Sequence, residues 1–323
     1  MIKNNFKIKL YNDMCLTRIV EEKIVSEYPK NEIRCPVHLS IGQEAISAGV
    51  SSLLKKKDLI LSAHRSHAHY LSKGGSIRAM IGEIYGKESG CVKGLGGSMH
   101  LLDLKAGVVG CVPIVGSTLP IAAGIALTNK LKKKNILTVV YFGDGAVETG
   151  VYYETLNFSK IHNLPLLFIC ENNFYSTFTK LDIRNARPNN ITHLAKSIGI
   201  KSYKEDGNDV EKVFKKTLKA KNFIIKNNQP ALIEFKTHRV YEHCGPNIDD
   251  ILGYRSDYFL NQWLTKCPIK QYEKKLVKDK ILTQKKINSI RHRIETKINK
   301  IFQKVKKDRL PKKNYLNKFI YAK

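Results

Sequence analysis

Two short polar motifs of this chain could together hold a divalent cation. The motif GDG at 143–145 follows an apolar run, and the motif ENN at 171–173 ends a second one. Asp144 supplies an anionic carboxylate oxygen and Asn173 a neutral carbonyl oxygen, and a backbone carbonyl could add a third ligand. Few protein oxygens leave positions for phosphate and water, which is how Mg²⁺ is usually held. GDG alone is more often a turn, but the two motifs together predict a magnesium site.

The residues after the aspartate extend this prediction to a phosphate group. Gly145 and Ala146 are predicted to begin the next helix, and main-chain amides at the start of a helix can face a diphosphate. Glycine at 143 and 145 would let that group approach the backbone closely. The predicted ligand is therefore a magnesium diphosphate.

The elements that must position these motifs can be predicted from the apolar pattern. Residues 136–142 (ILTVVYF) and 165–171 (PLLFICE) are continuous apolar runs, typical of strands that are covered on both faces. A helix ending near Asn163 joins them, and this strand–helix–strand unit implies a right-handed crossover and a parallel sheet. Ligands bind at the carboxyl edge of such sheets. Further predicted elements are helices over 8–29, from about Gly42, over 117–134 and over 209–228, and a strand over 231–240. The hydroxyls of Ser117 and Thr118, at the start of the third of these helices, are expected to cap it.

Composition bounds the class of protein. The chain has 323 residues, of which 42% are hydrophobic and 26% charged, which excludes wholesale disorder and a fibrous chain. Its seven cysteines contain no CxxC motif, so neither a zinc ribbon nor a thioredoxin-type pair fits. An odd cysteine count and an N-terminus without an apolar signal core predict reduced thiols in the cytoplasm. Residues 106–129 carry no charge, but their prolines and glycines predict a loop and a buried helix rather than a membrane span.

The net charge of +28 is concentrated near the C-terminus. Residues 264–323 hold 20 Lys or Arg and 4 Asp or Glu. Lysine outnumbers arginine 45 to 11 in the whole chain, which favours solvated faces and codon drift, because specific phosphate recognition prefers arginine. An acidic protein partner is the second interpretation. Nucleic acid is the least favoured, since no helix-turn-helix, zinc-finger or RNA-binding signature accompanies the charge.

GDG followed by NN, each ending a strand of one crossover unit, is the thiamine-diphosphate motif. Over about residues 8–262 the chain resembles the alpha subunits of thiamine-diphosphate-dependent 2-oxoacid dehydrogenases of the pyruvate and acetoin type. The matching segments, in chain order, are HLSIGQEA (38–45), HRSHAHYLSKG (64–74), KGLGGSMHLLD (93–103), PIVGST (113–118) and HRVYEHCGPNID (238–249). The resemblance implies the thiamine-diphosphate-binding α/β fold, a parallel sheet flanked by helices and followed here by C-terminal helices.

The resemblance also implies roles for individual residues. Arg65 would grip the diphosphate of thiamine diphosphate, and His38 and His243 would act near the substrate. The implied catalytic residues are His38 and His243; the implied cofactor-binding residues are His64, Arg65, Val115, Asp144, Gly145, Ala146, Asn173, Tyr175 and His243; and the implied magnesium ligands are the side chains of Asp144 and Asn173 and the main-chain oxygen of Tyr175. His67, His69 and His100 are predicted to be structural, because no cysteine or carboxylate stands at zinc-ligand spacing beside them.

Three departures from the family pattern leave the substrate open. Position 64 is His where many relatives have Tyr, and Pro113 replaces a usual glycine and so removes a backbone donor. In the loop that carries His243, this chain reads Tyr241-Glu242-His243-Cys244 where the pyruvate enzymes resemble His-Gly-His-Ser. Glu242 and Cys244 are therefore the departures. They change the charge of the loop and remove a hydroxyl that is phosphorylated in some relatives.

These observations predict an oxidoreductase chain that acts on a 2-oxoacid or an acyloin and passes an acyl group to an acceptor such as a lipoyl domain. A thiamine-dependent carboligase or lyase is the alternative, and a basic nucleic-acid-binding protein is a remote one. The resemblance implies a beta subunit in a heterotetramer of two alpha and two beta chains, because a chain of 323 residues accommodates only one α/β domain. Part of 106–129 is then expected at that interface. The predicted domains are 1–262, which binds the cofactor, and 263–323, a lysine-rich helical extension.

Overall fold

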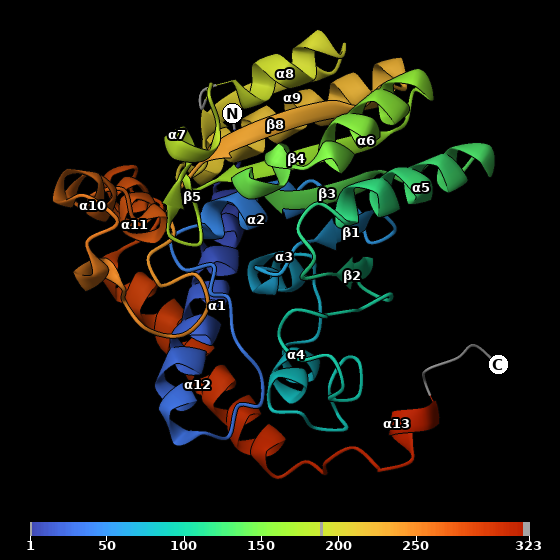
Figure 1. The fold of residues 1–323 in the computed structure, drawn as a ribbon. Coiled ribbons are helices and arrows are strands. Elements are labelled where there is room, and N and C mark those ends of the chain that lie inside the picture. Colours follow the sequence, from blue (N-terminus) through green and yellow to red (C-terminus); the bar gives the residue numbers. More distant parts are fainter. Residues whose placement is uncertain (1, 188–189, 319–323) are drawn as a thin grey trace.

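Six strands form one parallel sheet in the order β2-β1-β3-β4-β8-β7. The computed structural model describes residues 2–187 and 190–318, and Figure 1 shows the sheet between layers of helices. The strands are β1 (Leu59–Ser62), β2 (Val108–Cys111), β3 (Thr138–Gly143), β4 (Leu166–Asn172), β7 (Lys201–Asp206) and β8 (Ala231–Lys236), and a separate hairpin is formed by β5 (Tyr175–Ser176) and β6 (Thr179–Lys180). The predicted α/β class with a parallel sheet flanked by helices is confirmed.

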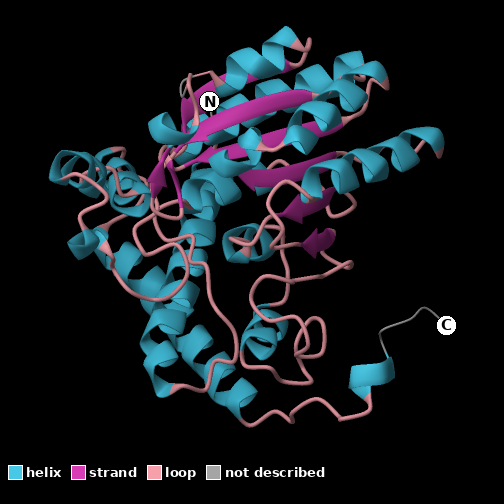
Figure 2. Cartoon of the chain, in the orientation of Figure 1, coloured by secondary structure: helices cyan, strands magenta, loops and turns pink. Residues whose placement is uncertain are grey.

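Helices cover both faces of the sheet, as Figure 2 shows. The α-helices are α1 (Asn4–Glu27), α2 (Glu44–Ser51), α3 (His67–Ser72), α4 (Ile77–Ile84), α5 (Thr118–Leu131), α6 (Gly150–Ile161), α7 (Leu181–Arg184), α8 (Ile191–Ser197), α9 (Val210–Asn227), α10 (Asp257–Leu264), α11 (Pro268–Lys278), α12 (Gln284–Lys306) and α13 (Tyr315–Lys318). Single 3-10 turns are η1 (Tyr28–Lys30), η2 (Asp144–Glu148) and η3 (Asp250–Leu252).

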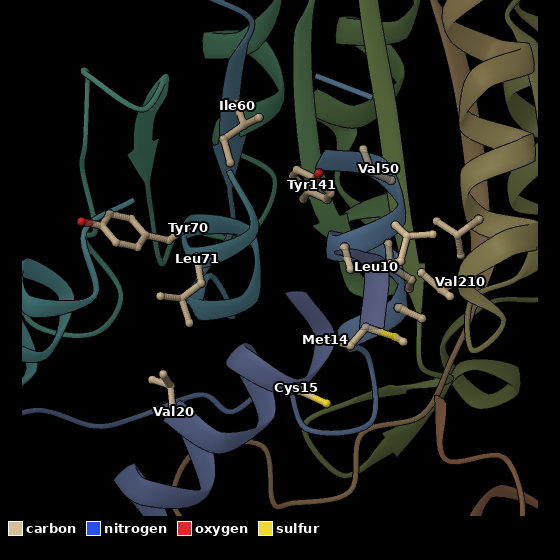
Figure 3. Close-up of a cluster of buried hydrophobic side chains, with 14 of the residues drawn as sticks. Leu10, Met14, Cys15, Val20, Val50, Ile60, Tyr70, Leu71, Tyr141 and Val210 are labelled. Atoms are coloured by element: carbon tan, nitrogen blue, oxygen red, sulfur yellow. The ribbon is translucent and has the colours of Figure 1, made fainter. Parts of the chain in front are cut away.

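Alternate side chains of the central strands enter two separate cores. Leu167 and Ile169 of β4 lie in a cluster with residues of α1, α2 and α9, whereas Phe168 and Cys170 lie in a cluster with residues of α5, α6 and α8. Figure 3 shows part of the first cluster, with Leu10 and Met14 of α1 near Val50 of α2. Because both sides of β3 and β4 are buried, their continuous apolar runs are explained.

Three strands of the sheet were not predicted, nor was the β5–β6 hairpin. β1 and β2 have four residues each, too few for a clear period, and β7 (KSYKED) lies at the edge of the sheet and is mostly polar. The predicted strand over 231–240 ends earlier, at Lys236. The chain leaves the sheet there and turns to the segment before α2, where the amide of Val240 donates to the carbonyl oxygen of Ile41 at 3.1 Å.

Two expectations about helix starts are wrong. Gly145 and Ala146 lie in η2, and α6 begins only at Gly150, so these two residues do not open the α-helix. Ser117 precedes α5, but its hydroxyl accepts no amide and instead donates to the carbonyl oxygen of Ile114 at 2.9 Å. In both cases a tight turn separates the loop from the helix.

The uncharged stretch 106–129 contains β2, a loop and α5. Leu119, Ala122 and Ala126 of α5 are buried, whereas Pro120 and Gly124 are exposed, so this helix is buried on one face only. The sequence predicted a buried helix here, so more of α5 is exposed than was predicted. No helix within residues 2–187 and 190–318 combines the length and the apolar character needed to cross a membrane.

The glycine-rich loop at 91–100 is held by one buried carboxylate. Glu83 of α4 is fully buried and accepts hydrogen bonds of 2.7 to 3.1 Å from the amides of Val92, Gly94, Gly96 and Gly97. Gly94 has a φ of +76°, and a Cβ there would lie 2.6 Å from the main-chain carbon of Gly86. These contacts order the loop despite its many glycines, and Met99 from the loop reaches the cavity described below.

The C-terminal helices pack on the N-terminal ones. α12 buries Ile287, Ile294, Ile298, Phe302 and Val305 in the same core as α1 and α4. Burial of each such side chain is worth about 1.5–3 kcal/mol, so α12 is firmly attached, and all of its lysines except Lys306, which pairs with Glu27 and Glu32, are exposed. The division of the chain at residue 262 stays a prediction. All seven cysteines are unpaired thiols.

Candidate active site

A cavity of about 220 Å³ opens where β1, β3 and β4 end. This is the carboxyl edge of the sheet, where the sequence predicted the site. Every predicted site residue lines the cavity: His38, His64, Arg65, Val115, Asp144, Gly145, Ala146, Asn173, Tyr175 and His243. The structure therefore brings together residues from six separate segments of the chain.

Two oxygen-bearing side chains follow neighbouring strands at this edge. Gly143 of β3 pairs with Glu171 of β4, so Asp144 and Asn173 emerge next to each other. Asp144 is almost fully buried, and this burial raises the pKa of its carboxyl to about 6. Asn173 is oriented because its Nδ2 donates to Gln43 Oε1 and its Oδ1 accepts from the amide of Tyr175, both at 3.2 Å. The carboxylate and amide oxygens are suited to a hard divalent cation.

The backbone beside Asp144 leaves room for a ligand. Gly143 has an ordinary φ of −83°, and a Cβ at this position would meet no atom within 4 Å. At Gly145 a Cβ would lie 3.0 Å from Ser176 Oγ. The fold itself therefore does not require a glycine at 143, and the open space in front of it borders the cavity.

Arg184 was missed by the sequence prediction. Its Nη2 lies 2.5 Å from Oδ2 of Asp144, its Nη1 pairs with Glu148, and its Nε donates to the carbonyl oxygen of Thr179 at 3.0 Å. The guanidinium comes from the end of α7, beyond the β5–β6 hairpin. No motif surrounds it in the sequence, so only the folded chain reveals the contact.

Arg65 follows β1, and its side chain contacts the loop that carries His243. Its guanidinium donates to the carbonyl oxygens of Leu39 at 2.7 Å and of His243 at 3.1 Å, which leaves further N–H groups for a ligand. Burial, together with the cation of Arg239, lowers the pKa of Arg65 to about 9, so it remains charged at neutral pH. No carboxylate within the described part of the chain bonds to Arg65, and a buried arginine in this state is suited to an anion.

Three imidazoles meet at one side of the cavity. The ring centroids of His38 and His64 are 4.7 Å apart, and His243 lies 5.2 and 5.3 Å from them. Burial and the Arg65 cation lower the pKa of His38 to about 2, of His64 to about 3 and of His243 to about 4. All three are therefore neutral at pH 7, and each offers one N–H donor and one acceptor nitrogen. Nδ1 of His38 is buried without a hydrogen-bond partner among the described residues.

The nitrogens of these three histidines lie within 4.8 Å of one another, close enough to suggest a metal site. The neighbouring Arg65 would repel a metal ion bound to these nitrogens, because its positive charge already lowers the pKa of each ring. The cluster is better suited to an anionic or carbonyl-bearing ligand than to a resident metal ion.

Two other histidines are structural. His69 lines the cavity, stacks on Tyr141 with centroids 3.9 Å apart and contacts Glu171 and Ser62 through its two nitrogens at 3.1 and 2.8 Å. His67 is fully buried between Glu21 and Ser98. Both have their ring nitrogens paired, which is what a structural histidine requires. His100 contacts the carbonyl oxygen of Gly96 at 2.7 Å and is exposed.

The loop that carries His243 is anchored by a buried ion network. Arg255 pairs with Asp249 at 2.5 Å and donates to the carbonyl oxygen of Arg239 at 2.7 Å, while Tyr254 donates to Asp249 at 2.6 Å. Glu242 accepts from the amide of Asn247 at 2.9 Å, and Cys244 is exposed. Glu242 and Cys244, which depart from the family pattern, thus flank a histidine whose main-chain oxygen is held by Arg65.

The chain matches the model of one protein family, described as the dehydrogenase E1 component, over residues 11–314. This match extends beyond residue 262, where the sequence resemblance was expected to end, and includes α11 and α12.

Three relatives illustrate the similarity. The pyruvate dehydrogenase E1 component subunit alpha of Rickettsia felis is 32% identical over 98% of this chain and 95% of its own length. The chloroplastic pyruvate dehydrogenase E1 component subunit alpha-3 of Arabidopsis thaliana is 31% identical over 89% of this chain and 68% of its own length. The alpha subunit of acetoin:2,6-dichlorophenolindophenol oxidoreductase from Bacillus subtilis is 36% identical over 72% of this chain and 70% of its own length.

Proposed function

The chain belongs to the dehydrogenase E1 component family, and from that premise we propose that it is the alpha subunit of a thiamine-diphosphate-dependent dehydrogenase for a 2-oxoacid or an acyloin. One observation carries the proposal. A single cavity joins the oxygen donors of Asp144 and Asn173, the buried Arg65 and three neutral imidazoles, as binding of a metal diphosphate and of a carbonyl substrate requires.

The donor set fits magnesium thiamine diphosphate. Asp144, Asn173 and the main-chain oxygen of Tyr175 would hold Mg²⁺, and the remaining N–H groups of Arg65 would bind the diphosphate, with His64 beside it. Gly143, Gly145 and Ala146 border the space for the phosphates, and Val115 would contact the aminopyrimidine ring. When bound, the cofactor supplies a nucleophilic carbon for attack on a substrate carbonyl.

The chain's own residues would handle protons and orient the substrate. His38 and His243 are neutral, so each can accept a proton at its free nitrogen or donate its N–H to a carbonyl or carboxylate oxygen. Arg65 holds the carbonyl oxygen of His243 at 3.1 Å and so fixes the backbone of the loop from which that ring reaches the cavity. Gln43 accepts a hydrogen bond from Asn173 and is itself held by Glu171, which contacts His69, so this buried network orients Asn173.

The substrate proposed is pyruvate or a similar 2-oxoacid, or acetoin, with transfer of an acyl group to an acceptor such as a lipoyl-bearing acyltransferase. Proteins similar to this chain are named for pyruvate and for acetoin. The three imidazoles make the site polar, which favours a small polar substrate over a long aliphatic one.

A protein partner is proposed on the outer side of α5 and α6. Ile114, Val115 and Ile121 are 46–66% exposed, and Tyr153 and Ile161 of α6 are also exposed. Large apolar side chains exposed on neighbouring helices are typical of an interface. We propose that a beta subunit covers them and completes a heterotetramer of two alpha and two beta chains. The cytoplasmic location stays a prediction.

The test begins with calorimetric titration of thiamine diphosphate into the chain with its co-expressed beta partner, in the presence and absence of Mg²⁺. Saturable binding only with Mg²⁺ is expected. The same preparation is then assayed with pyruvate, branched-chain 2-oxoacids and acetoin and an artificial electron acceptor. Absence of magnesium-dependent binding would contradict the cofactor, whereas binding without turnover on this panel would contradict only the substrate class.

A further inference from the structure

Arg184 is largely buried and contacts Asp144 of the candidate metal site. Its side chain is only 11% exposed, and all three of its nitrogens are engaged, by Asp144, Glu148 and the carbonyl oxygen of Thr179. Among the described residues, no other side chain bonds to the carboxylate of Asp144. The orientation of this carboxylate therefore depends on Arg184.

The charges around Arg184 leave the site attractive to a cation. Asp144 and Glu148 carry two negative charges against one guanidinium, so the three side chains together have a net charge of −1. The guanidinium occupies Oδ2 of Asp144 and leaves the second carboxylate oxygen for another ligand. Arg184 thus fixes the carboxylate without neutralising the cluster.

Arg184 also connects two parts of the proposed metal site. Asn173 and Tyr175 stand at the start of the segment that forms the β5–β6 hairpin and α7, and Arg184 stands at its end. Its Nε holds Thr179 of this hairpin at 3.0 Å. The contact with Asp144 therefore joins the segment after β4 to the residue after β3.

Resting on the proposed function, we propose that Arg184 is a positioning residue of the metal site, which holds Oδ2 of Asp144 and the 173–184 segment so that their oxygen ligands face one cation. Carboxylates that bind a metal are commonly oriented by an outer hydrogen-bonding partner, and loss of such a partner typically weakens metal binding about 10–100-fold. Nothing in the resemblance to known families assigned this residue.

The test measures metal affinity directly and does not depend on turnover. The full chain with its partner is titrated with Mn²⁺ alone, and bound Mn²⁺ is followed by electron paramagnetic resonance. R184Q is expected to bind Mn²⁺ about 10–100-fold more weakly. R184K keeps the charge but not the planar fork, so an intermediate affinity is expected. K180Q is the matched control, because Lys180 is an exposed cation of the same segment that pairs with Asp182; its affinity should equal that of the unsubstituted chain.

The outcomes separate this proposal from the proposed function. If the unsubstituted chain binds Mn²⁺ and R184Q binds it equally well, Arg184 is only a structural tether and the proposal is overturned. Tighter binding by R184Q would also overturn it, since Arg184 would then compete with the metal. If R184Q fails to fold, R184K decides in the same way. If the unsubstituted chain has no Mn²⁺ binding that D144A removes, the metal site itself is wrong, and this proposal fails with it.

Discussion

The guanidinium of Arg65 donates a hydrogen bond to the main-chain oxygen of His243 across 178 residues of sequence, at 3.1 Å. The first residue follows β1 and the second lies in the loop after β8. This contact puts the proposed diphosphate ligand and the proposed acid–base residue in one unit, so that the loop cannot shift without disturbing the arginine. The predictions below use this arrangement.

Asp144→Ala should abolish magnesium-dependent binding of thiamine diphosphate while the fold persists, because the variant loses a ligand and the ion pair with Arg184 but no apolar core contact. Calorimetry with and without Mg²⁺ measures the loss, and circular dichroism checks the fold. Asp182→Ala, which removes an exposed carboxylate near the same site, should bind normally. Unchanged affinity of the Asp144 variant would exclude the GDG motif as the metal site.

His243→Ala should lower turnover far more than cofactor affinity, because Arg65 and the metal ligands remain. An acid–base residue typically contributes about 10²–10⁴-fold in rate. Steady-state assays and calorimetry on the same preparation separate the two effects, and His292→Ala on the exposed side of α12 serves as the control. Normal turnover of the His243 variant would make this histidine a structural residue.

Acid should destabilise the protein below about pH 6.5. The folded-state pKa values of His38, His64 and His243 are lowered to about 2, 3 and 4 from an ordinary 6.5. Between pH 6.5 and 4 the unfolded chain therefore binds protons that the folded chain does not, and stability falls as the pH falls. Burial also lowers the pKa of His238 to about 3, which adds to this trend, whereas the pKa of Asp144, raised to about 6, acts in the opposite direction.

Urea denaturation between pH 7.5 and 4.5 measures this trend. The midpoint should be steady down to about pH 6.5 and then decline. His64→Gln removes one of these rings, so its decline should be shallower. A midpoint that is constant over the whole range would show that the rings are not held neutral by the fold.

Ile114→Glu should weaken assembly with the beta subunit, because this side chain is 66% exposed beside the cavity and a charge there would have to be buried in the interface. Size-exclusion chromatography and turnover of the co-expressed chains provide the measurement. Leu310→Glu changes a residue that is 63% exposed elsewhere and should assemble normally. Full activity of the unsubstituted chain without any partner would contradict the proposed interface.

The sequence alone was sufficient where the local pattern and the long-range contacts agree. The runs that became β3 and β4 are apolar throughout because both faces of each strand are covered, and the two polar motifs follow them directly. The helices over Asn4–Glu27 and Val210–Asn227 were likewise predictable from their apolar spacing. Membership of the family could be inferred at this level, because the motifs are short and continuous in the chain.

The sequence was insufficient where a residue's environment is set by distant segments. β7 is polar because it lies at an edge, and its pairing with β8 could not be read from its own residues. The start of α6 was placed too early because a 3-10 turn and a helix have similar local signals. The strand after α9 was predicted to end at residue 240 but ends at Lys236, because the amide of Val240 bonds to Ile41 instead of to a neighbouring strand.

By itself, then, the sequence determined the α/β class, the family and ten of the residues that line the cavity. Only the tertiary structure decided how those residues are held: Glu83 on the amides of the glycine-rich loop, Arg65 on the loop of His243, and Arg184 on Asp144. The physical reason is that a motif specifies chemistry over a few consecutive residues, whereas hydrogen bonds and burial depend on side chains that folding brings from far away in the chain.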